Sequence, residues 1–244
     1  MPAFYLEGRA EVGAVVPLTK DESKHALKVL RMSVGEELCA LDGCGGRFAA
    51  VLESVHGDTA EVRITEQLPS NEPAVKVTLY QGLPKADKLD FITQKLTELG
   101  AYCIVPVKME RCVVKSDAKD GKKRQERLQR IACEAVKQCR RACEPEVTEP
   151  MTWKQCFEKM KQHDLLLVPW EDAEGYTMKR AFADAPDAKD IGIVIGSEGG
   201  MSAAEVDALV QQGAKIVTLG PRILRAETAA VASVTMAMTL WGDL

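Results

Sequence analysis

Glycines, carboxylates and guanidinium groups gather in two loops, each of which follows a run of apolar residues. The first loop, SEGG at residues 197–200, comes directly after the apolar run 191–196. The second follows the run 214–219 and carries Gly220, Arg222, Arg225, Glu227 and Thr228. Glycine lets a backbone approach a ligand closely, and the helix expected after each loop offers free N–H donors at its amino end. This pattern is typical of a ligand-binding crevice in an α/β protein.

The spacing of the glycines excludes two common nucleotide-binding motifs. There is no G-x-G-x-x-G, and no Walker lysine follows the glycines. Ser202 and Glu205 have the spacing of a capping box, which predicts a helix that begins just after the first loop. Two ordinary strand-to-helix turns remain an equally good explanation of the spacing alone.

The elements that must position these loops alternate between strands and helices from residue 74 onward. Apolar runs predict strands at 75–81, 103–107, 165–168, 191–196 and 214–219. Helical spacing predicts helices at 85–99, 123–140 and 229–241, the middle one with a basic outer face. Strands that alternate with helices favour a mainly parallel sheet, so the predicted fold class is α/β.

The first 70 residues follow another pattern. Short strands separated by glycine turns are predicted at 10–16, 37–41, 46–55 and 59–67. A helix is predicted at 20–30, with Ala26, Leu27 and Leu30 on one apolar side. We therefore expect a small β-rich, barrel-like module, followed by a linker at 69–73 that contains two prolines. The chain is predicted to divide into domains at residues 1–72 and 73–244.

Charge is distributed unevenly along the chain. The net charge of −4 over 244 residues argues against nucleic-acid binding by bulk charge. Residues 108–141, however, hold twelve lysines and arginines against five acidic residues. Such a local basic segment is the electrostatic pattern of a site for a polyanion; a solvated lysine-rich helix is the alternative.

Composition also limits the compartment and the cofactors. None of the eight cysteines forms C-x-x-C, and Cys139 and Cys143, one helical turn apart, lack the partner ligands of a metal site. We therefore expect no metal and a reducing environment. The sequence has no apolar run of membrane-spanning length and no secretory signal, so we predict a cytoplasmic protein with no membrane partner.

Four blocks stand in order along the chain: HALKVLRMSVGEEL at 25–38, KADKLDFITQKLTELGAYCIVPVKMERCVVK at 85–115, RQERLQRIACEAVKQCRRACEPEV at 124–147, and IGSEGGMSAAE with LGPRILRAETA within 195–229. Together they resemble the RsmE family, the bacterial 16S rRNA (uracil-N3)-methyltransferases of the SPOUT class. Ser197 stands where the family pattern has proline. The resemblance implies a PUA-like RNA-binding domain at 1–72. It also implies a SPOUT methyltransferase domain at 73–244, with a parallel sheet and a carboxyl-terminal trefoil knot, a rare topology.

The resemblance also implies S-adenosylmethionine as cofactor, held by three loops at the carboxyl ends of strands: 167–171, 196–200 and 219–229. The residues expected to bind it are Leu167, Ile195, Gly196, Glu198, Gly199, Gly200, Leu219, Gly220, Ile223, Leu224, Thr228 and Ala229. Uracil N3 must lose its proton before it can attack, and a guanidinium can stabilise the resulting anion. Candidate catalytic residues are therefore Glu198 and Glu227 for the proton and Arg222 and Arg225 for the anion or a phosphate. The base itself remains open among them.

The substrate implied is 16S rRNA of the small ribosomal subunit, with the target base unpaired or flipped. Residues expected to contact RNA are Arg9, Lys24, His25, Lys28, Arg31, Arg111, Lys115, Lys122, Lys123 and Arg124. SPOUT enzymes are typically dimers, so we expect a homodimer, for which the last apolar helix is one candidate interface. Two alternatives stay open: a 2′-O-ribose methyltransferase of the same fold, and an rRNA-binding assembly factor without activity.

Overall fold

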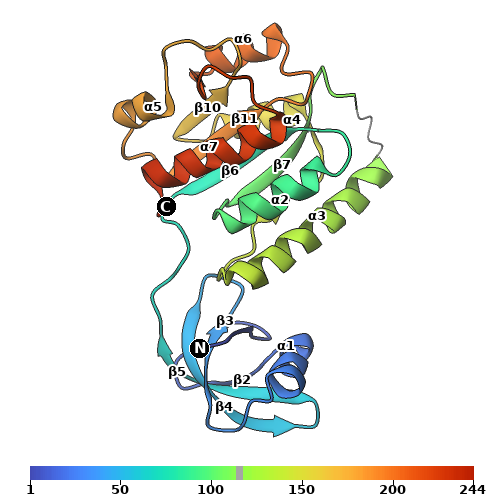
Figure 1. The fold of residues 1–244 in the computed structure, drawn as a ribbon, viewed down its shortest axis with the longest axis vertical. Coiled ribbons are helices and arrows are strands. Elements are labelled where there is room, and N and C mark those ends of the chain that lie inside the picture. The colour runs from blue at the N-terminus through green and yellow to red at the C-terminus, as the bar shows by residue number, and fades with distance from the viewer. Residues whose placement is uncertain (114–117) are drawn as a thin grey trace. The chain divides into compact units, whose positions relative to one another are not determined.

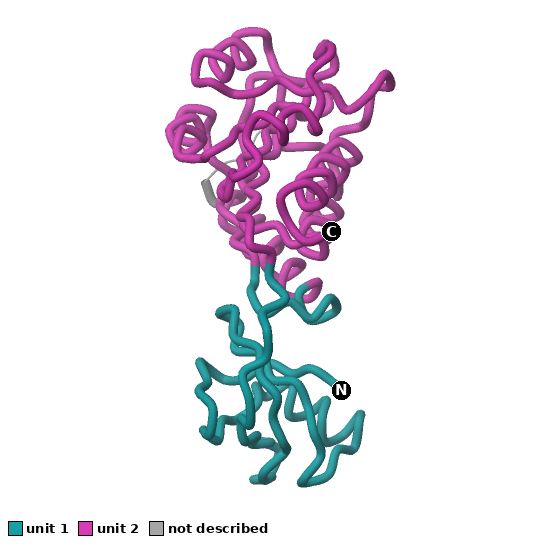
Figure 2. The backbone as a smooth tube through the Cα atoms, turned by 90° about the vertical axis from the view of Figure 1, so that its left-hand side faces the viewer, with its two compact units in different colours: residues 1–72, 136–144 teal, residues 73–135, 145–244 magenta. Residues whose placement is uncertain are grey.

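The computed structural model describes residues 1–113 and 118–244, and these form two compact units (Figure 2). Unit 1 consists of residues 1–72 together with 136–144, and unit 2 of residues 73–135 together with 145–244. The predicted boundary after Glu72 coincides with a boundary between the units. Residues 136–144 differ from the prediction, because Ala142 is buried against Cys39 and Leu41 in unit 1.

Unit 1 is a five-stranded sheet in the order β1-β3-β4-β5-β2. Its strands are β1 (Ala3–Tyr5), β2 (Val15–Pro17), β3 (Glu37–Leu41), β4 (Arg47–His56) and β5 (Thr59–Gln67). The two edge strands meet beyond their ends, where Glu7 N–H donates to Pro17 O at 2.9 Å and Thr19 N–H to Tyr5 O at 3.0 Å. These bonds close the sheet on itself, which fits the predicted barrel-like module.

The helix predicted at residues 20–30 has two parts. It begins as α1 (Lys20–Lys24) and continues as a π-helical turn, η1 (His25–Val29). A π-helix has more residues per turn than an α-helix, so the apolar face expected from α-helical spacing is not kept. Ala26 is fully buried, whereas Leu30 is 47% exposed. Leu27 packs with Ala26 in the core of unit 1, so the predicted apolar side was wrong only at Leu30.

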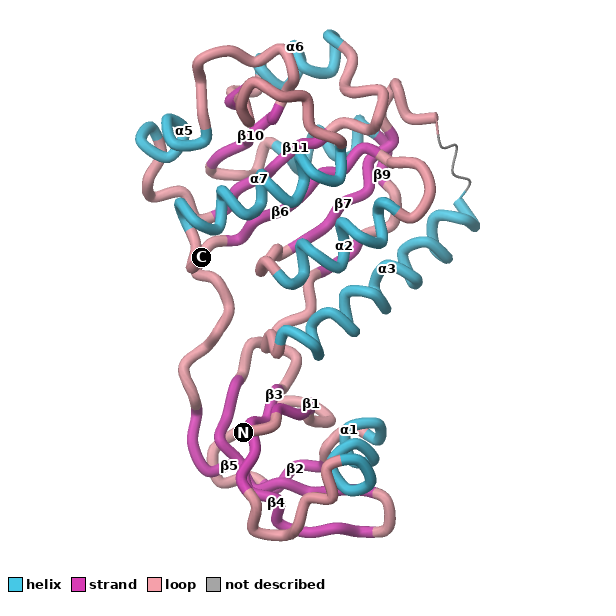
Figure 3. The backbone as a smooth tube through the Cα atoms, viewed as in Figure 1, coloured by secondary structure: helices cyan, strands magenta, loops and turns pink. Residues whose placement is uncertain are grey.

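Unit 2 is built on a parallel sheet in the order β12-β10-β11-β6-β7-β8, with β9 paired to β7 (Figures 1 and 3). The strands are β6 (Lys76–Gly82), β7 (Cys103–Lys108), β8 (Glu146–Val147), β9 (Met151–Thr152), β10 (Leu165–Pro169), β11 (Asp190–Ile195) and β12 (Lys215–Val217). The helices are α2 (Lys88–Glu98), α3 (Ala118–Cys139), α4 (Trp153–Met160), α5 (Met178–Asp184), α6 (Ala203–Gln211) and α7 (Ala226–Trp241). The predicted α/β class is confirmed.

Helices cover both faces of this sheet because successive strand residues point to opposite sides. Leu79 and Ile193 lie in one buried cluster, with side chains of α2, α3, α5 and α7. Their neighbours Tyr80 and Val194 lie in the second cluster, with side chains of α4 and α6. Strands that are apolar on both sides explain the continuous apolar runs of the sequence.

The capping box predicted for α6 is present. The Ser202 hydroxyl accepts from Glu205 N–H, and the Glu205 carboxylate accepts from Ser202 N–H at 2.9 Å. Helices α4 and α5 and the short strands β8 and β9 were not predicted. α7 begins at Ala226, three residues before the predicted start. No helix of the described residues is long and apolar enough to cross a membrane.

Candidate active site

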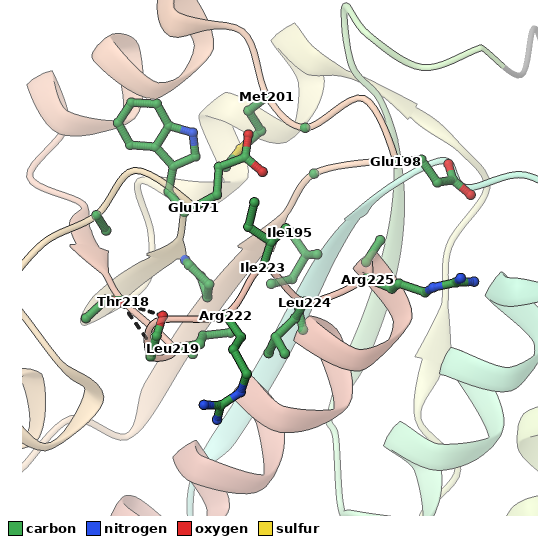
Figure 4. A pocket seen from close by; sticks show the side chains of 18 of the residues that line it. Glu171, Ile195, Glu198, Met201, Thr218, Leu219, Arg222, Ile223, Leu224 and Arg225 are labelled. Carbon is green, nitrogen blue, oxygen red and sulfur yellow. Dashed lines mark hydrogen bonds between the residues drawn. The ribbon is translucent and has the colours of Figure 1, made fainter.

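A cavity of about 760 Å³ lies at the carboxyl ends of β10, β11 and β12 (Figure 4). The loops that follow these three strands line it, together with the start of α7 and Lys88, the first residue of α2. The carboxyl edge of a parallel sheet is where α/β proteins bind ligands, because the chain turns away from each strand there. The two loops singled out by their glycines and charges therefore meet at one site.

The glycines of the first loop lie so close to neighbouring backbone atoms that a side chain would not fit, whether or not a ligand is bound. A Cβ at Gly196 would lie 2.8 Å from the Gly200 carbonyl carbon, and one at Gly199 would lie 2.9 Å from Arg111 O. A Cβ at Gly82, where β6 ends, would lie 2.6 Å from Ser197 N. Three chain segments thus pack backbone to backbone beneath the cavity, which leaves no room for side chains there.

Apolar side chains form the middle of the cavity. Ile195, Leu219, Ile223 and Leu224 line it, with Met201 nearer one end (Figure 4). Ile223 is 82% exposed, which is unusual for a large aliphatic side chain. An exposed aliphatic side chain at the wall of a cavity suits the flat face of a ring such as adenine, since contact with the ring removes apolar surface from water.

A three-residue ion cluster lies at the edge of the cavity. The Lys88 ammonium is 2.9 Å from Glu198 Oε1 and 3.3 Å from Glu227 Oε2. Glu198 Oε1 also accepts from the Lys85 N–H at 3.0 Å. Burial raises the pKa of Glu198, but the hydrogen bonds from Lys88 and Lys85 outweigh burial, so the pKa lies below its ordinary value. Glu198 is therefore a weaker base than a free glutamate.

Two guanidinium groups at the cavity are available to bind a ligand. Arg222 and Arg225 line the cavity, and neither forms an ion pair with any residue that the structure describes. Arg225 is also the N-cap residue of α7 and makes no side-chain capping bond. The free N–H groups and positive end of the helix dipole add to this charge. The arrangement favours an anion beside α7.

Most of the predicted site residues line this cavity. They are Ile195, Gly196, Glu198, Gly200, Leu219, Gly220, Arg222, Ile223, Leu224, Arg225 and Ala229. Four others do not line it: Leu167 is fully buried in β10, Gly199 packs on Arg111, Thr228 lies exposed in the first turn of α7, and Glu227 pairs with Lys88. Their roles as binding or catalytic residues stay predictions.

Several lining residues were missed by the sequence interpretation. Lys88, Met201 and Thr218 line the cavity, as do residues 173–175 after β10. Lys88 belongs to one of the four family-like blocks, but its distance along the chain from Glu198 and Glu227 hid the contact. A cation at the amino end of a predicted helix, where the helix dipole disfavours it, was the available signal.

The residues expected to contact RNA lie in both units. Arg9, Lys24, His25, Lys28 and Arg31 are exposed in unit 1, where Lys28 pairs with Asp58 at 3.0 Å. In unit 2, Lys122 and Lys123 are exposed on α3, Arg124 is half-buried, and Arg111 donates to Gly199 O at 3.4 Å beside the cavity. Lys115 lies outside the described residues.

Within residues 1–113 and 118–244, no cluster of three or more His, Cys, Asp or Glu could hold a metal ion.

The fold and the cavity define the class as an α/β protein with a ligand site at the carboxyl edge of a parallel sheet, preceded by a β-barrel unit. Two family models match the chain. An RNA methyltransferase domain covers residues 70–238, and an RNA methyltransferase PUA domain covers residues 18–65. The class is thus an RNA methyltransferase with a PUA domain.

Similar proteins narrow the class further. The ribosomal RNA small subunit methyltransferase E of Bacillus subtilis is 36% identical over 94% of this chain and 93% of its own length. Its namesake in Mycobacterium bovis is 31% identical over 93% of this chain and 87% of its own length. The crystal structure of a ribosomal RNA small subunit methyltransferase E from Neisseria gonorrhoeae, bound to S-adenosyl methionine, has a TM-score of 0.79 and 32% identity and covers 100% of this chain and 99% of that one. The chain belongs to the ribosomal RNA small subunit methyltransferase E family.

Proposed function

We propose that this protein transfers the methyl group of S-adenosylmethionine to N3 of one uridine in 16S rRNA of the small ribosomal subunit. The observation that carries the proposal is the cavity at the ends of β10, β11 and β12, where free guanidinium groups stand beside an apolar wall. Relatives named as small subunit rRNA methyltransferases support the substrate. A relative bound to S-adenosyl methionine supports the donor.

The residues of the cavity fit the donor. The exposed side chain of Ile223 and its neighbours Leu219 and Leu224 offer apolar contact to an adenine ring, and the backbone groups of Ile195 and Gly196 suit its polar edge. Bound there, S-adenosylmethionine supplies a methyl group activated by a sulfonium. The protein must hold the acceptor in line with that methyl and keep water away.

The charged residues are assigned to proton removal and to stabilisation of the resulting anion. We assign Arg225 to the negative charge that develops on the uracil when N3 loses its proton, because its guanidinium has no ion-pair partner among the described residues. Arg222 is assigned to the same anion or to a phosphate. Glu198 and Glu227 are the candidates for the proton, and the hydrogen bonds of Glu198 lower its pKa and so weaken it as a base.

RNA capture is assigned to the exposed basic residues of both units, since Lys and Arg contacts to phosphate position a nucleic acid while the pocket selects the base.

We also propose a homodimer. Phe91 on α2 and Met236 on α7 leave 47% and 38% of their surface exposed on helices that pack against each other, which suits an apolar interface. The trefoil knot and the cytoplasmic location stay predictions that follow from the family.

The proposal is tested by mass spectrometry of nucleosides from small-subunit rRNA, taken from cells with and without the gene. We expect loss of 3-methyluridine in its absence, and restoration when purified protein and S-adenosylmethionine are added. Unchanged 3-methyluridine would overturn the proposal. A lost ribose methyl group instead would indicate 2′-O-methylation, and no lost methyl group would indicate binding without catalysis.

A further inference from the structure

Lys88 occupies a position that helix stability does not explain. It is the first residue of α2, after the N-cap Asp87, whose side chain makes no capping bond. A cation at the amino end of a helix meets the positive end of the helix dipole, which is unfavourable by a few tenths of a kcal/mol or more. Any stabilisation that Lys88 provides must therefore come from contacts outside its own helix.

Those contacts join three separate parts of the cavity wall. Glu198 belongs to the loop after β11, Glu227 to the first turn of α7, and Lys88 to α2. The ammonium reaches Glu198 at 2.9 Å and Glu227 at 3.3 Å. The three side chains are 26%, 29% and 18% exposed for Lys88, Glu198 and Glu227. At this exposure the charges are only partly screened by solvent.

Without Lys88 two carboxylates would face each other across the wall. Each carboxylate would lose the ammonium that lies between them, and like charges repel. The loop after β11 and the start of α7 would then move apart, and both line the cavity. Hydrogen bonding to Glu198 in turn raises the pKa of Lys88 above its ordinary value, which keeps the ammonium charged.

We propose that Lys88 is a positioning residue of the donor pocket, whose ammonium holds the loop after β11 and the first turn of α7 together through Glu198 and Glu227. Lys88 sets the shape of the cavity before the donor enters and orients the Glu227 carboxylate. This inference rests on the proposed function for the identity of the donor. The contact between Lys88 and the two carboxylates does not depend on that identity.

The first experiment compares Lys88→Met, Lys88→Arg and the control Lys95→Met. Lys95 lies on the same helix and pairs with Glu98 at 2.9 Å away from the cavity. Calorimetric titration with S-adenosylmethionine should show binding about tenfold weaker for Lys88→Met, since hydrogen bonds between charged groups are lost. Lys88→Arg should recover most of the affinity, and Lys95→Met should bind like the unchanged protein. Unchanged affinity in Lys88→Met would overturn the proposal.

The second experiment asks whether Lys88 acts through Glu198. Urea unfolding of Lys88→Met, Glu198→Gln and the double variant forms a double-mutant cycle that needs no ligand. We expect coupling of at least about threefold in the unfolding equilibrium constant, because either change alone removes the same ion pair. Independent effects would refute the positioning role. If Lys88→Met does not fold, Lys88→Gln replaces it in both experiments.

The two experiments keep this inference separate from the proposed function. Failure of the unchanged protein to bind S-adenosylmethionine would refute the proposed donor and leave the coupling in urea as the test of Lys88. Donor binding without coupling would refute the role of Lys88 and leave the proposed function standing.

Discussion

At the residue scale, the site separates charges that are paired from charges that are free. Lys88 pairs with both Glu198 and Glu227, whereas Arg222 and Arg225 form no ion pair with a described residue. A paired group is held by its partner, whereas a guanidinium without an ion-pair partner can donate to an anion. This difference guides the first two predictions.

Arg225→Ala is expected to lower kcat about 100-fold, because removing one group that stabilises developing negative charge typically costs this much. Donor affinity should change little, since Arg225 is assigned to the acceptor. Methylation kinetics at saturating donor and a calorimetric donor titration check both parts. Arg180→Ala, on α5 and against the Tyr176 ring, is the control. Full turnover in Arg225→Ala would contradict the assignment.

Glu198 should make the stability of the protein depend on pH in the acid range. Its pKa is lowered from 4.5 in the folded protein, because hydrogen bonds from Lys88 and Lys85 outweigh burial. A lowered folded pKa gives stability that is complete above pH 4.5 and is lost as the pH falls through the folded value. The stabilities of Glu198→Gln and of the unchanged protein in urea should therefore differ at pH 7 and converge as the pH falls through the lowered pKa of Glu198. An equal difference at both ends of this range would rule this linkage out.

At the scale of elements, the cavity depends on close passage of three chain segments. β6 ends at Gly82, the loop after β11 runs through residues 196–200, and the loop after β7 places Arg111 against Gly199. Side chains are excluded here by the neighbouring backbone, and backbone segments yield less than the ends of flexible side chains. The glycines noted in the sequence therefore shape the wall of the site.

Gly196→Ala is expected to lower both stability and donor affinity. Its Cβ would lie 2.8 Å from the Gly200 carbonyl carbon, so the loop must shift, at a cost of about 1–3 kcal/mol. Gly121→Ala is the matched control, because in α3 the added Cβ would meet Pro150 at an ordinary 3.5 Å. That change should be neutral or stabilise by about 0.5–1 kcal/mol. Thermal unfolding and donor titration of both variants measure the contrast; equal behaviour would contradict the packing argument.

At the scale of the whole molecule, the net charge of −4 conceals a basic segment within an acidic chain. Lys122 and Lys123 are exposed on α3, and Arg124 beside them is half-buried. Binding to RNA releases counterions in proportion to the number of phosphates that are neutralised. The salt dependence of binding therefore reports whether this segment contacts RNA.

Charge reversal of Lys122, Lys123 and Arg124 to glutamate should weaken binding to a small-subunit rRNA fragment and flatten its dependence on salt. Filter binding between about 50 and 200 mM salt gives the slope. Reversal of Lys179, Arg180 and Lys189, three exposed residues elsewhere in unit 2, changes the net charge equally and should leave the slope closer to that of the unchanged protein. The same slope in both triple variants would remove α3 from the RNA site.

The sequence by itself determined the fold class, the two loops and the α6 cap, because these depend on interactions between neighbouring residues. Apolar runs marked the strands of unit 2, and Ser202 with Glu205 marked the start of α6. Local spacing also misled at η1, where the π-helical turn moved Leu30 to the surface.

Only the tertiary structure decided which charges meet. Lys88 is distant in sequence from Glu198 and Glu227, and parallel strands bring all three to one edge of a sheet. Residues 136–144 likewise join unit 1, where Ala142 is buried, although residues 136–139 are the end of α3, a helix that begins in unit 2. Such contacts depend on how the chain folds back on itself, and the short-range periodicity of the sequence does not predict them.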